Sequence, residues 1–564
     1  MENYKSKTGN GLLAICMGKN YQDSMVVYRE YVQNACDSIY EAMKLGYYAS
    51  DDEKCIAIEI DPANKKVCFM DRGTGVQQDQ IGPRLVDLGA SVKNGIDQIG
   101  SNGIGRLVGA NWCDRIIFET SAKGEKTKSI LTFDSIQAHK LIQNKTGDCT
   151  ESLDMVTSCH YEDENENEHY FRVTLENAKE SLYRDLKSVQ EYLSSMVPVD
   201  YSYEFYDLLR QDLKENLEYR DLFKKLICCH VTVNGNVIEK PYTKEIYSEG
   251  SSTPKRITPP SFFKIEDSMF GTLAWGWYAF NEKIEQMNSL PYRGIRLRKH
   301  NMAIGNSEYL MQFFPKPVDA NYFIGEIHII HPDIHPTGTR EAIETSDSQA
   351  ANMFIYRLKN LFKDFKQVYE NLSRLGSAAL TPLINAQLAI TMNTSIQGST
   401  EIAPEVKQES AVKAQEARVE LVKAKGELKK KIKAIQSSST TSPKVLDFIV
   451  NKFDKEITAH VDSVNSKPNN GIQVAGFKLE PIIQEVLNET SSSASPISEE
   501  STTQSSQMSR EPEDETGVEQ FKVLGKPGYK LMKQVYQILD SEKDLPPQIR
   551  EKLKKKLLKK LVGK

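Results

Sequence analysis

The sequence lacks three features that would place the protein in or beyond a membrane. No run of about 18 or more apolar residues occurs, so we expect no membrane-spanning helix. The early apolar stretch at residues 11–18 is short and is followed by Lys19, which makes it a poor secretory core. The nine cysteines all lie between Cys16 and Cys229 without a paired framework. This pattern favours a reducing compartment, and we expect a cytoplasmic protein.

An excess of basic charge is also absent. Lys and Arg number 72 against 77 Asp and Glu, which gives a formal net charge of -5. Overall charge therefore does not indicate a nucleic-acid-binding protein. Hydrophobic residues make up 39 % and charged residues 26 % of the 564 residues, as is typical of a folded globular chain. At about 100–200 residues per domain, the length predicts several domains.

Helix and strand patterns alternate along the first 200 residues, which predicts an α+β domain there. Apolar residues recur every three or four positions over residues 21–45, and this spacing predicts a long helix. A second helix is expected over residues 178–196. The strand patterns lie at residues 55–60, 67–70, 115–120, 128–133 and 171–175.

A second mixed unit is expected over residues 201–375. The Asn234-Gly235 pair predicts a hairpin within residues 231–237, because both residues accept the positive φ of a tight turn. Further strands are predicted at 270–280, 294–298 and 325–330, and a helix at 347–375. Four C-terminal segments follow: a helical segment at 376–436, a small mostly helical segment at 437–489, a disordered linker at 490–516 and basic amphipathic helices at 517–564.

The first pattern with chemical meaning lies on the long predicted helix. Glu30 and Asn34 are four residues apart and therefore share one helix face. A carboxylate there can orient a water molecule, and an amide can bind a hard cation through its oxygen. The same spacing also occurs on ordinary solvated helix edges, so the pair needs support from other segments.

The second pattern is a turn, Asp71-Arg72-Gly73-Thr74-Gly75, directly after an apolar strand. A carboxylate at the end of a strand can accept a hydrogen bond from an exocyclic amine such as that of adenine. Glycine lets the backbone approach a planar ring closely. An ordinary Asp-Gly turn is the alternative.

The third pattern is a glycine-rich loop at residues 99–106 that contains Gly100, Gly103 and Gly105. The backbone N–H groups of such a loop can bind phosphate oxygens. The loop is not the dinucleotide fingerprint, because the order of its glycines and the preceding strand are wrong for G-x-G-x-x-G. It is not a P-loop either, because no Gly-Lys-Ser/Thr follows.

Taken together and in this order, the three patterns resemble the GHKL ATPase superfamily, which includes gyrase, the 90-kilodalton heat-shock chaperone, histidine kinases and MutL. Residues 28–37 and 99–105 are similar to the chaperone's segments. The resemblance covers about residues 10–200, and continues more weakly through 294–301 and 335–341 to about 375, as in MutL and MORC proteins. It implies a Bergerat-fold α/β sandwich ATPase domain at 1–200, a ribosomal-S5-like domain at 201–375 and a mostly helical C-terminal region.

The resemblance also implies a role for individual residues. Glu30 would be the general base that polarises the attacking water, and Arg340 would reach the γ-phosphate from the second domain; an ion pair with Glu341 is the alternative for Arg340. Asn34 would help to hold Mg²⁺. The remaining ATP-binding positions would be Asp71, Gly73 and Gly75 at the adenine, Lys93, Gly100, Gly103, Ile104 and Gly105 at the phosphates, and Thr174 or Thr132 as support for the adenine site.

The function that the resemblance implies is a slow, Mg²⁺-dependent ATPase. It would act as an ATP-gated clamp, as a homodimer, on a protein client. One alternative is a DNA-acting clamp of the MutL or MORC type, in which Arg296, Arg298, Lys299 and His300 form a basic strand that tracks phosphates. Another is an ATP-sensing scaffold with little turnover.

Two small groups of residues have the composition of metal ligands. They are the run Cys228-Cys229-His230 and the triplet His328, His331 and His335. Two adjacent buried thiols and a rigid proline-containing turn are the respective alternatives.

Overall fold

The computed structural model describes most of the chain up to residue 491. The described residues are 8–18, 22–50, 54–88, 105–143, 147–247, 253–288, 290, 292–438, 440–466, 473–491, 536 and 554. The chain divides into two compact units, Met1–Ser493 and Ala494–Lys564. In the second unit only Tyr536 and Lys554 are described, so the linker predicted at 490–516 and the helices predicted at 517–564 lie almost wholly outside the described residues.

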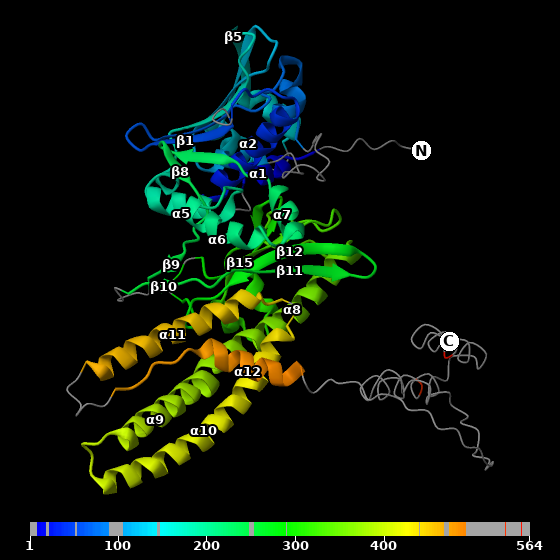
Figure 1. Ribbon diagram of the computed structural model, residues 1–564. Coiled ribbons are helices and arrows are strands. Elements are labelled where there is room, and N and C mark those ends of the chain that lie inside the picture. The colour runs from blue at the N-terminus through cyan, green and yellow to red at the C-terminus, as the bar shows by residue number, and fades with distance from the viewer. Residues whose placement is uncertain are drawn as a thin grey trace. The chain divides into compact units, whose positions relative to one another are not determined.

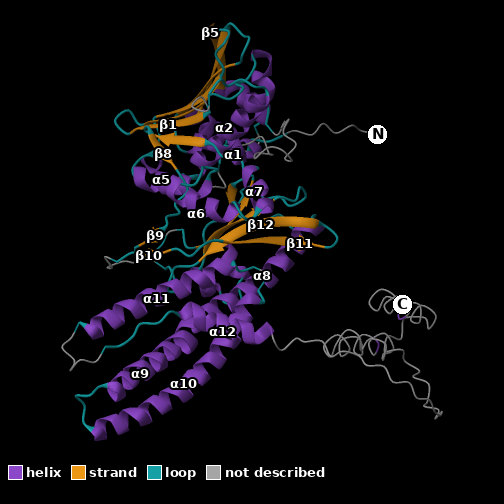
Figure 2. Ribbon diagram, in the orientation of Figure 1, coloured by secondary structure: helices purple, strands orange, loops and turns teal. Residues whose placement is uncertain are grey.

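An eight-stranded sheet forms the N-terminal part of the first unit (Figures 1 and 2). Its strands in spatial order are β5 (Thr157–Asp163), β4 (Thr127–Asp134), β3 (Arg115–Ser121), β6 (Tyr170–Glu176), β2 (Lys66–Asp71), β1 (Cys55–Asp61), β7 (His230–Val233) and β8 (Asn236–Ile238). Neighbouring strands are antiparallel except β1 and β7, which are parallel. All five strands predicted in the first 200 residues are present.

Helix α2 (Val26–Lys44) packs on the sheet and confirms the long helix predicted there. The rings of Tyr28 and Tyr31 meet Phe69 of β2 edge to face, with centroids 5.4 and 5.0 Å apart. This packing fixes the face of α2 that looks toward the end of β2. The other helices of this part are α1 (Gly11–Cys16), η2 (Gln78–Gln80), η3 (Gly82–Val86), η4 (Gly105–Asn111), α3 (Ser135–Leu141), α4 (Cys149–Val156), η5 (Glu180–Leu182) and α5 (Leu186–Met196).

The helix predicted at 178–196 begins later than expected. Asn177 directly follows β6 and has a positive φ of 49°, which prevents a helix from beginning there. Asp185 then caps α5, because its carboxylate accepts a hydrogen bond from the backbone N–H of Ser188. Residues 178–185, which have helical spacing in the sequence, therefore form a loop and the short helix η5.

The hairpin at 231–237 is correctly predicted, but it belongs to the first sheet. Its strands β7 and β8 extend that sheet beside β1, with Ile56 opposite Val231. The first sheet is thus completed by residues that lie beyond the boundary predicted near residue 200. The sequence could not reveal this, because a short edge hairpin carries no signal of its partner.

A five-stranded sheet follows, in the order β11 (Ser261–Asp267), β12 (Gly271–Ala279), β15 (Ile324–Ile329), β13 (Gly294–Lys299) and β14 (Met302–Ile304). Strands β13 and β15 are parallel, and α8 (Gln349–Arg374) packs its apolar face on this sheet. Three predicted strands and the predicted helix at 347–375 are confirmed. The remaining elements are α6 (Tyr203–Leu213), α7 (Leu217–Lys224), β9 (Glu245–Ile246), β10 (Lys255–Arg256), η6 (Tyr309–Phe313) and η7 (Pro317–Tyr322).

The C-terminal part of the first unit is helical, as predicted (Figure 2). It consists of η8 (Leu375–Leu380), α9 (Thr381–Gly398), α10 (Pro404–Gln436), α11 (Pro443–Asn465) and α12 (Leu479–Ser491). Among the described residues, one continuous helical stretch, Gln349–Gly398, is long and apolar enough to cross a membrane by length and composition alone. Helices that pack within soluble proteins also satisfy this criterion, and Leu375, Leu380 and Leu383 in this stretch are fully buried.

Candidate functional site

One face of α2 carries three polar side chains at four-residue intervals: Glu30, Asn34 and Ser38. Each is only partly exposed, whereas the neighbouring positions Tyr31, Ala35 and Ile39 are buried against the sheet. The Glu30 side chain retains 12 % exposure. The face that the sequence predicts for catalysis is therefore half-sheltered, as a site that admits a ligand requires.

Arg29 fixes the carboxylate of Glu30. Its Nε and Nη2 donate to Oε1 of Glu30 at 3.1 and 2.9 Å, and the Arg29 side chain is buried. Both contacts use the same carboxylate oxygen. The other oxygen, Oε2, points toward Gly105, at which an added Cβ would lie only 2.6 Å away. The structure thus brings together Glu30 and Gly105, from the first and third sequence patterns.

The turn after β2 is built around Asp71, which is buried. Oδ1 of Asp71 accepts a hydrogen bond from the backbone N–H of Gly73 at 2.8 Å. Ser38 holds the next residue, because its Oγ accepts from the backbone N–H of Thr74 at 3.0 Å. An added Cβ at Gly73 would collide with Ser38, so the glycine lets α2 and the turn meet. The second pattern therefore joins the same face of α2.

Gly75 and Thr120 close the far side of this turn. Gly75 has a φ of +65°, and an added Cβ would lie 1.9 Å from the carbonyl oxygen of Ser121. The buried hydroxyl of Thr120 accepts from the backbone N–H of Val76 at 2.9 Å and donates to the carbonyl of Tyr170 at 2.8 Å. Thr120 therefore ties the turn to β3 and β6.

Thr174 and Thr132 do not take this part, which corrects the sequence prediction. Thr174 donates to Cys68 Sγ at 3.7 Å, and Cys68 alternates along β2 with Phe69 and Asp71. Because side chains alternate between the two faces of a strand, Thr174 lies on the face opposite Asp71. Thr132 shares that opposite face, since both threonines are paired with Ile117 of β3.

His169 is a further residue that the sequence analysis missed. Its Nδ1 lies 2.7 Å from the carbonyl oxygen of Gly73, and Tyr47 packs edge-on against its ring at 5.1 Å. Tyr48 donates to the carbonyl of Arg72 at 2.8 Å. Two consecutive carbonyl groups of the turn are therefore held from the end of α2 and the start of β6. No sequence spacing links these positions to Asp71.

Arg340 lies near Glu30 although it belongs to the loop between β15 and α8. It interacts electrostatically with Arg29, Glu30 and Asp37. The pKa of Arg340 is lowered to about 10, mainly by burial and additionally by the nearby charge of Arg29, against the opposing effects of Glu30 and Asp37. Its Nη2 donates to the carbonyl of Lys299 at 3.3 Å, and its φ is 55°. The structure thus brings the predicted second-domain arginine to the predicted general base.

The remaining predicted phosphate contacts, Lys93, Gly100, Gly103 and Ile104, lie outside the described residues. The described residues on either side of them are joined by Arg106. Its Nε donates to the carbonyl of Leu85 at 3.0 Å and its Nη2 to the carbonyl of Asp87 at 2.5 Å. The start of η4 is thereby fixed beside η3, and Tyr31 of α2 adds a hydrogen bond to the Arg106 carbonyl at 3.0 Å.

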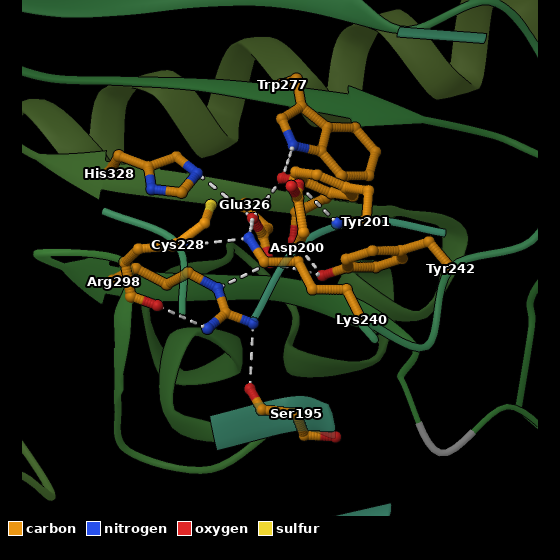
Figure 3. Close-up of polar contacts among 12 residues, drawn as sticks. Ser195, Asp200, Tyr201, Cys228, Lys240, Tyr242, Trp277, Arg298, Glu326 and His328 are labelled. Carbon is orange, nitrogen blue, oxygen red and sulfur yellow. Dashed lines mark hydrogen bonds and ion pairs between the residues drawn. The ribbon is translucent and has the colours of Figure 1, made fainter. Parts of the chain in front are cut away.

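The prediction that a basic strand lies on the surface and tracks DNA phosphates is wrong. Arg296, Arg298 and Lys299 are 6 %, 0 % and 4 % exposed. Arg298 and Lys240 both contact the carboxylate of Glu326 at 2.6 Å, inside a cluster that also includes Tyr201, at 2.5 Å (Figure 3). The sequence showed a run of basic residues but not their buried carboxylate partner, which lies on another strand.

This buried cluster shifts the protonation of its members. Burial would raise the pKa of Glu326, but Arg298 and Lys240 hold it well below its ordinary value. Burial lowers the pKa of Lys240 to about 8 and that of His328 to about 4, although Glu326 opposes both shifts. Arg298 also donates to the carbonyl of Ser195 at 2.9 Å (Figure 3). The cluster therefore joins the end of α5 to the second sheet.

Neither predicted metal group is supported. Among the described residues, no three His, Cys, Asp or Glu side chains are arranged to hold a metal ion. His328 instead stacks on Trp275 with ring centroids 4.8 Å apart. The cysteine run ends in Cys229, which is buried beside Cys36 of α2.

Comparison with protein families identifies the first domain. Residues 21–163 match the family described as "Histidine kinase-, DNA gyrase B-, and HSP90-like ATPase". The N-terminal part of the chain contains a GHKL ATPase domain. The match spans α2, the turn after β2 and strands β1 to β5, and thus every described site residue except His169 and Arg340. A search of characterised proteins gives no match for the chain.

Proposed function

We propose that this protein binds ATP with Mg²⁺, hydrolyses it slowly and uses the cycle as an ATP-gated clamp. The observation that carries the proposal is the meeting of Glu30, Gly105 and Arg340. A carboxylate, a glycine backbone and a cation from the loop after β15 converge on one half-sheltered place. Phosphoryl transfer to water requires this combination of an oriented nucleophile and neutralised charge.

Each residue has one role in the proposed reaction. Asp71 accepts a hydrogen bond from the adenine amine at the end of β2. Glu30 orients the attacking water through Oε2, while Arg29 keeps its other oxygen engaged. Arg340 contacts the γ-phosphate and stabilises the charge that develops there. The backbone of Gly105 passes close enough to Glu30 to align the phosphate chain with the water.

Magnesium fits the oxygen donors of α2. The amide oxygen of Asn34, one helical turn from Glu30, is a hard ligand of the kind that Mg²⁺ prefers. When bound, the ion neutralises phosphate charge. We therefore infer that Asn34 is the protein's contact to Mg²⁺.

The clamp part of the proposal rests on the position of Arg340. Because Arg340 lies in the loop that follows β15 of the second sheet, its contact with a γ-phosphate would couple nucleotide state to the position of that sheet. ATP would then favour one arrangement and ADP another. We propose that the protein works in this way as a homodimer on a protein client. The DNA-acting alternative loses its main support, since Arg296, Arg298 and Lys299 are buried.

Two substitutions test the site. In Glu30→Gln we expect ATP binding to persist and turnover to be lost, because the amide cannot orient water as a base. In Asp71→Asn we expect ATP binding itself to be lost. Isothermal titration with ATP and Mg²⁺ measures binding, and phosphate release measures turnover.

Glu41→Gln provides the matched control, because Glu41 is an exposed carboxylate on the same helix. Wild-type turnover in both Glu30→Gln and Glu41→Gln contradicts the catalytic assignment. Sedimentation with and without a non-hydrolysable ATP analogue tests the clamp. ATP-dependent dimers without measurable turnover would instead favour the ATP-sensing scaffold.

A further inference from the structure

Strand β5 ends the eight-stranded sheet, and no described strand pairs with its outer long edge. In the described part of the chain it pairs only with β4, from Thr127 opposite Asp163 to Phe133 opposite Thr157. From Ser158 to Asp163 every residue is exposed on both faces of the strand. Figure 1 shows β5 at the extremity of this sheet, beyond its helices.

Three features that commonly block pairing at an edge are absent from β5: short length, proline and a bulge. This strand is seven residues long, contains no proline and keeps an unshifted register with β4 throughout. Alternate residues therefore present backbone N–H and C=O groups outward, and an extended peptide can pair with them as an added strand.

The charge beside this edge selects the kind of peptide. Five carboxylates follow one another closely: Glu162, Asp163, Glu164, Glu166 and Glu168. Two lysines oppose them, since Lys128 lies 3.3 Å from Glu162 and Lys126 lies 3.9 Å from Glu166. Five negative charges against two positive ones leave a local net charge of -3. Among the described residues, Asp163 and Glu168 form no ion pair.

The side chains of β5 add an apolar contact at its centre. Tyr161 is 48 % exposed, and Cys159 is exposed on the same face of the strand. On the other face His160 lies 3.6 Å from Glu162. A strand that pairs with β5 would contact the ring of Tyr161 near the middle of β5 and the carboxylate of Asp163 at its end.

We propose that β5 is a docking edge for an extended, lysine- or arginine-rich peptide segment of a partner protein, which adds to the sheet as a ninth strand. Backbone pairing supplies the register, and the carboxylates at 162–168 exclude acidic segments and favour basic ones. The surface is far along the sheet from Glu30 and Asp71, since β4, β3 and β6 separate β5 from β2. Peptide binding at β5 is therefore independent of the proposed ATPase reaction.

The test uses the full chain and a fluorescent nine-residue peptide that alternates lysine with valine and threonine. We expect saturable binding by fluorescence anisotropy. The same peptide with glutamate in place of lysine should not bind, nor should a lysine peptide N-methylated at alternate residues. Hydrogen exchange of the amides at 158–162 should slow when the lysine peptide is present.

Charge reversal locates the site. Asp163→Lys with Glu168→Lys should weaken binding about tenfold or more, the effect of roughly 1.4 kcal/mol. Glu59→Lys with Glu239→Lys changes net charge equally on exposed carboxylates near the opposite end of the sheet, and should leave binding unchanged. Equal loss in both variants, equal binding of the glutamate or N-methylated peptide, or unchanged exchange at 158–162 overturns the proposal. Concentration-dependent protection of 158–162 without peptide also overturns it, because a second copy would then occupy the edge.

Discussion

The carboxylate of Glu30 lies directly against the backbone of Gly105. An added Cβ at Gly105 would be 2.6 Å from Oε2, and the other carboxylate oxygen is already held by Arg29. Glu30 cannot turn away without breaking that ion pair. The geometry therefore makes Gly105 a steric partner of the proposed general base as well as a member of the proposed phosphate-binding loop.

Gly105→Ala should lower ATP turnover on the order of 100-fold, the cost of displacing a reacting group by about 1 Å. The measurement is phosphate release at saturating ATP. Gly11→Ala is the control, since Gly11 also begins a helical segment of this domain and an added Cβ there meets nothing within 4 Å. Wild-type turnover in Gly105→Ala would mean that Glu30 Oε2 does not act on the water.

Thr120→Val should destabilise the fold and weaken nucleotide binding together. The substitution keeps the shape but leaves the N–H of Val76 and the carbonyl of Tyr170 without their partner, at a cost of about 1–3 kcal/mol. Urea unfolding and ATP titration measure the two effects. Thr120→Ser keeps the hydroxyl and should stay close to wild type; a similar loss in both variants would implicate the methyl group instead.

His328 should make the protein sensitive to mild acid. Its pKa is lowered to about 4 by burial, with Lys240 and Arg298 adding to the shift and Glu326 opposing it. Between pH 6.5 and 4 the unfolded chain takes up a proton that the folded chain does not. The free energy of unfolding therefore falls as the pH drops through this window, by on the order of 3 kcal/mol in total, and the contribution is complete above pH 6.5.

The check is the urea midpoint at pH 7.5 and at pH 5 for wild type and His328→Gln. The variant should lose part of the acid sensitivity, whereas His160→Gln, at an exposed histidine, should keep all of it. Identical pH slopes in wild type and His328→Gln would show that His328 is protonated as easily when folded as when unfolded.

Substitution of Glu326 should lower the free energy of unfolding far more than substitution of Lys240. The cluster holds one carboxylate against the two cations Lys240 and Arg298, all 0 % exposed. Glu326→Gln leaves both cations buried without an anion and should cost about 3–5 kcal/mol of unfolding free energy. Lys240→Met leaves the pair of Glu326 and Arg298 intact and should cost distinctly less. Equal losses in urea unfolding at pH 7 would contradict this charge balance.

Local patterns were sufficient to predict most of the elements and the two ends of the site. Helical spacing located α2 and strand alternation located β2, so that Glu30, Asn34 and Asp71 could be placed on adjoining elements. The glycines were predicted from the conformations they permit, and Gly75 does have a positive φ. These inferences succeed because they depend on residues close together in the sequence.

The residues that support the turn could not be predicted in this way. Thr120 and His169 reach the turn only because β3 and β6 lie beside β2, a pairing order that strand patterns do not encode. The same reason explains the error at Arg296 and Arg298. Whether a basic strand is a surface or a buried ion cluster depends on Glu326 of β15, about 30 residues further along the chain.

The hairpin β7–β8 has a practical consequence for dissecting this chain. A fragment that stops near residue 200 lacks β7 and β8, so β1 becomes an unpaired edge strand that favours aggregation. Extending the fragment to residue 240 restores the sheet, but the ammonium group of Lys240 then lacks its counter-ion, because Glu326 belongs to the next sheet. The ATPase domain and the sheet that follows should therefore melt as a single cooperative body rather than as separable modules.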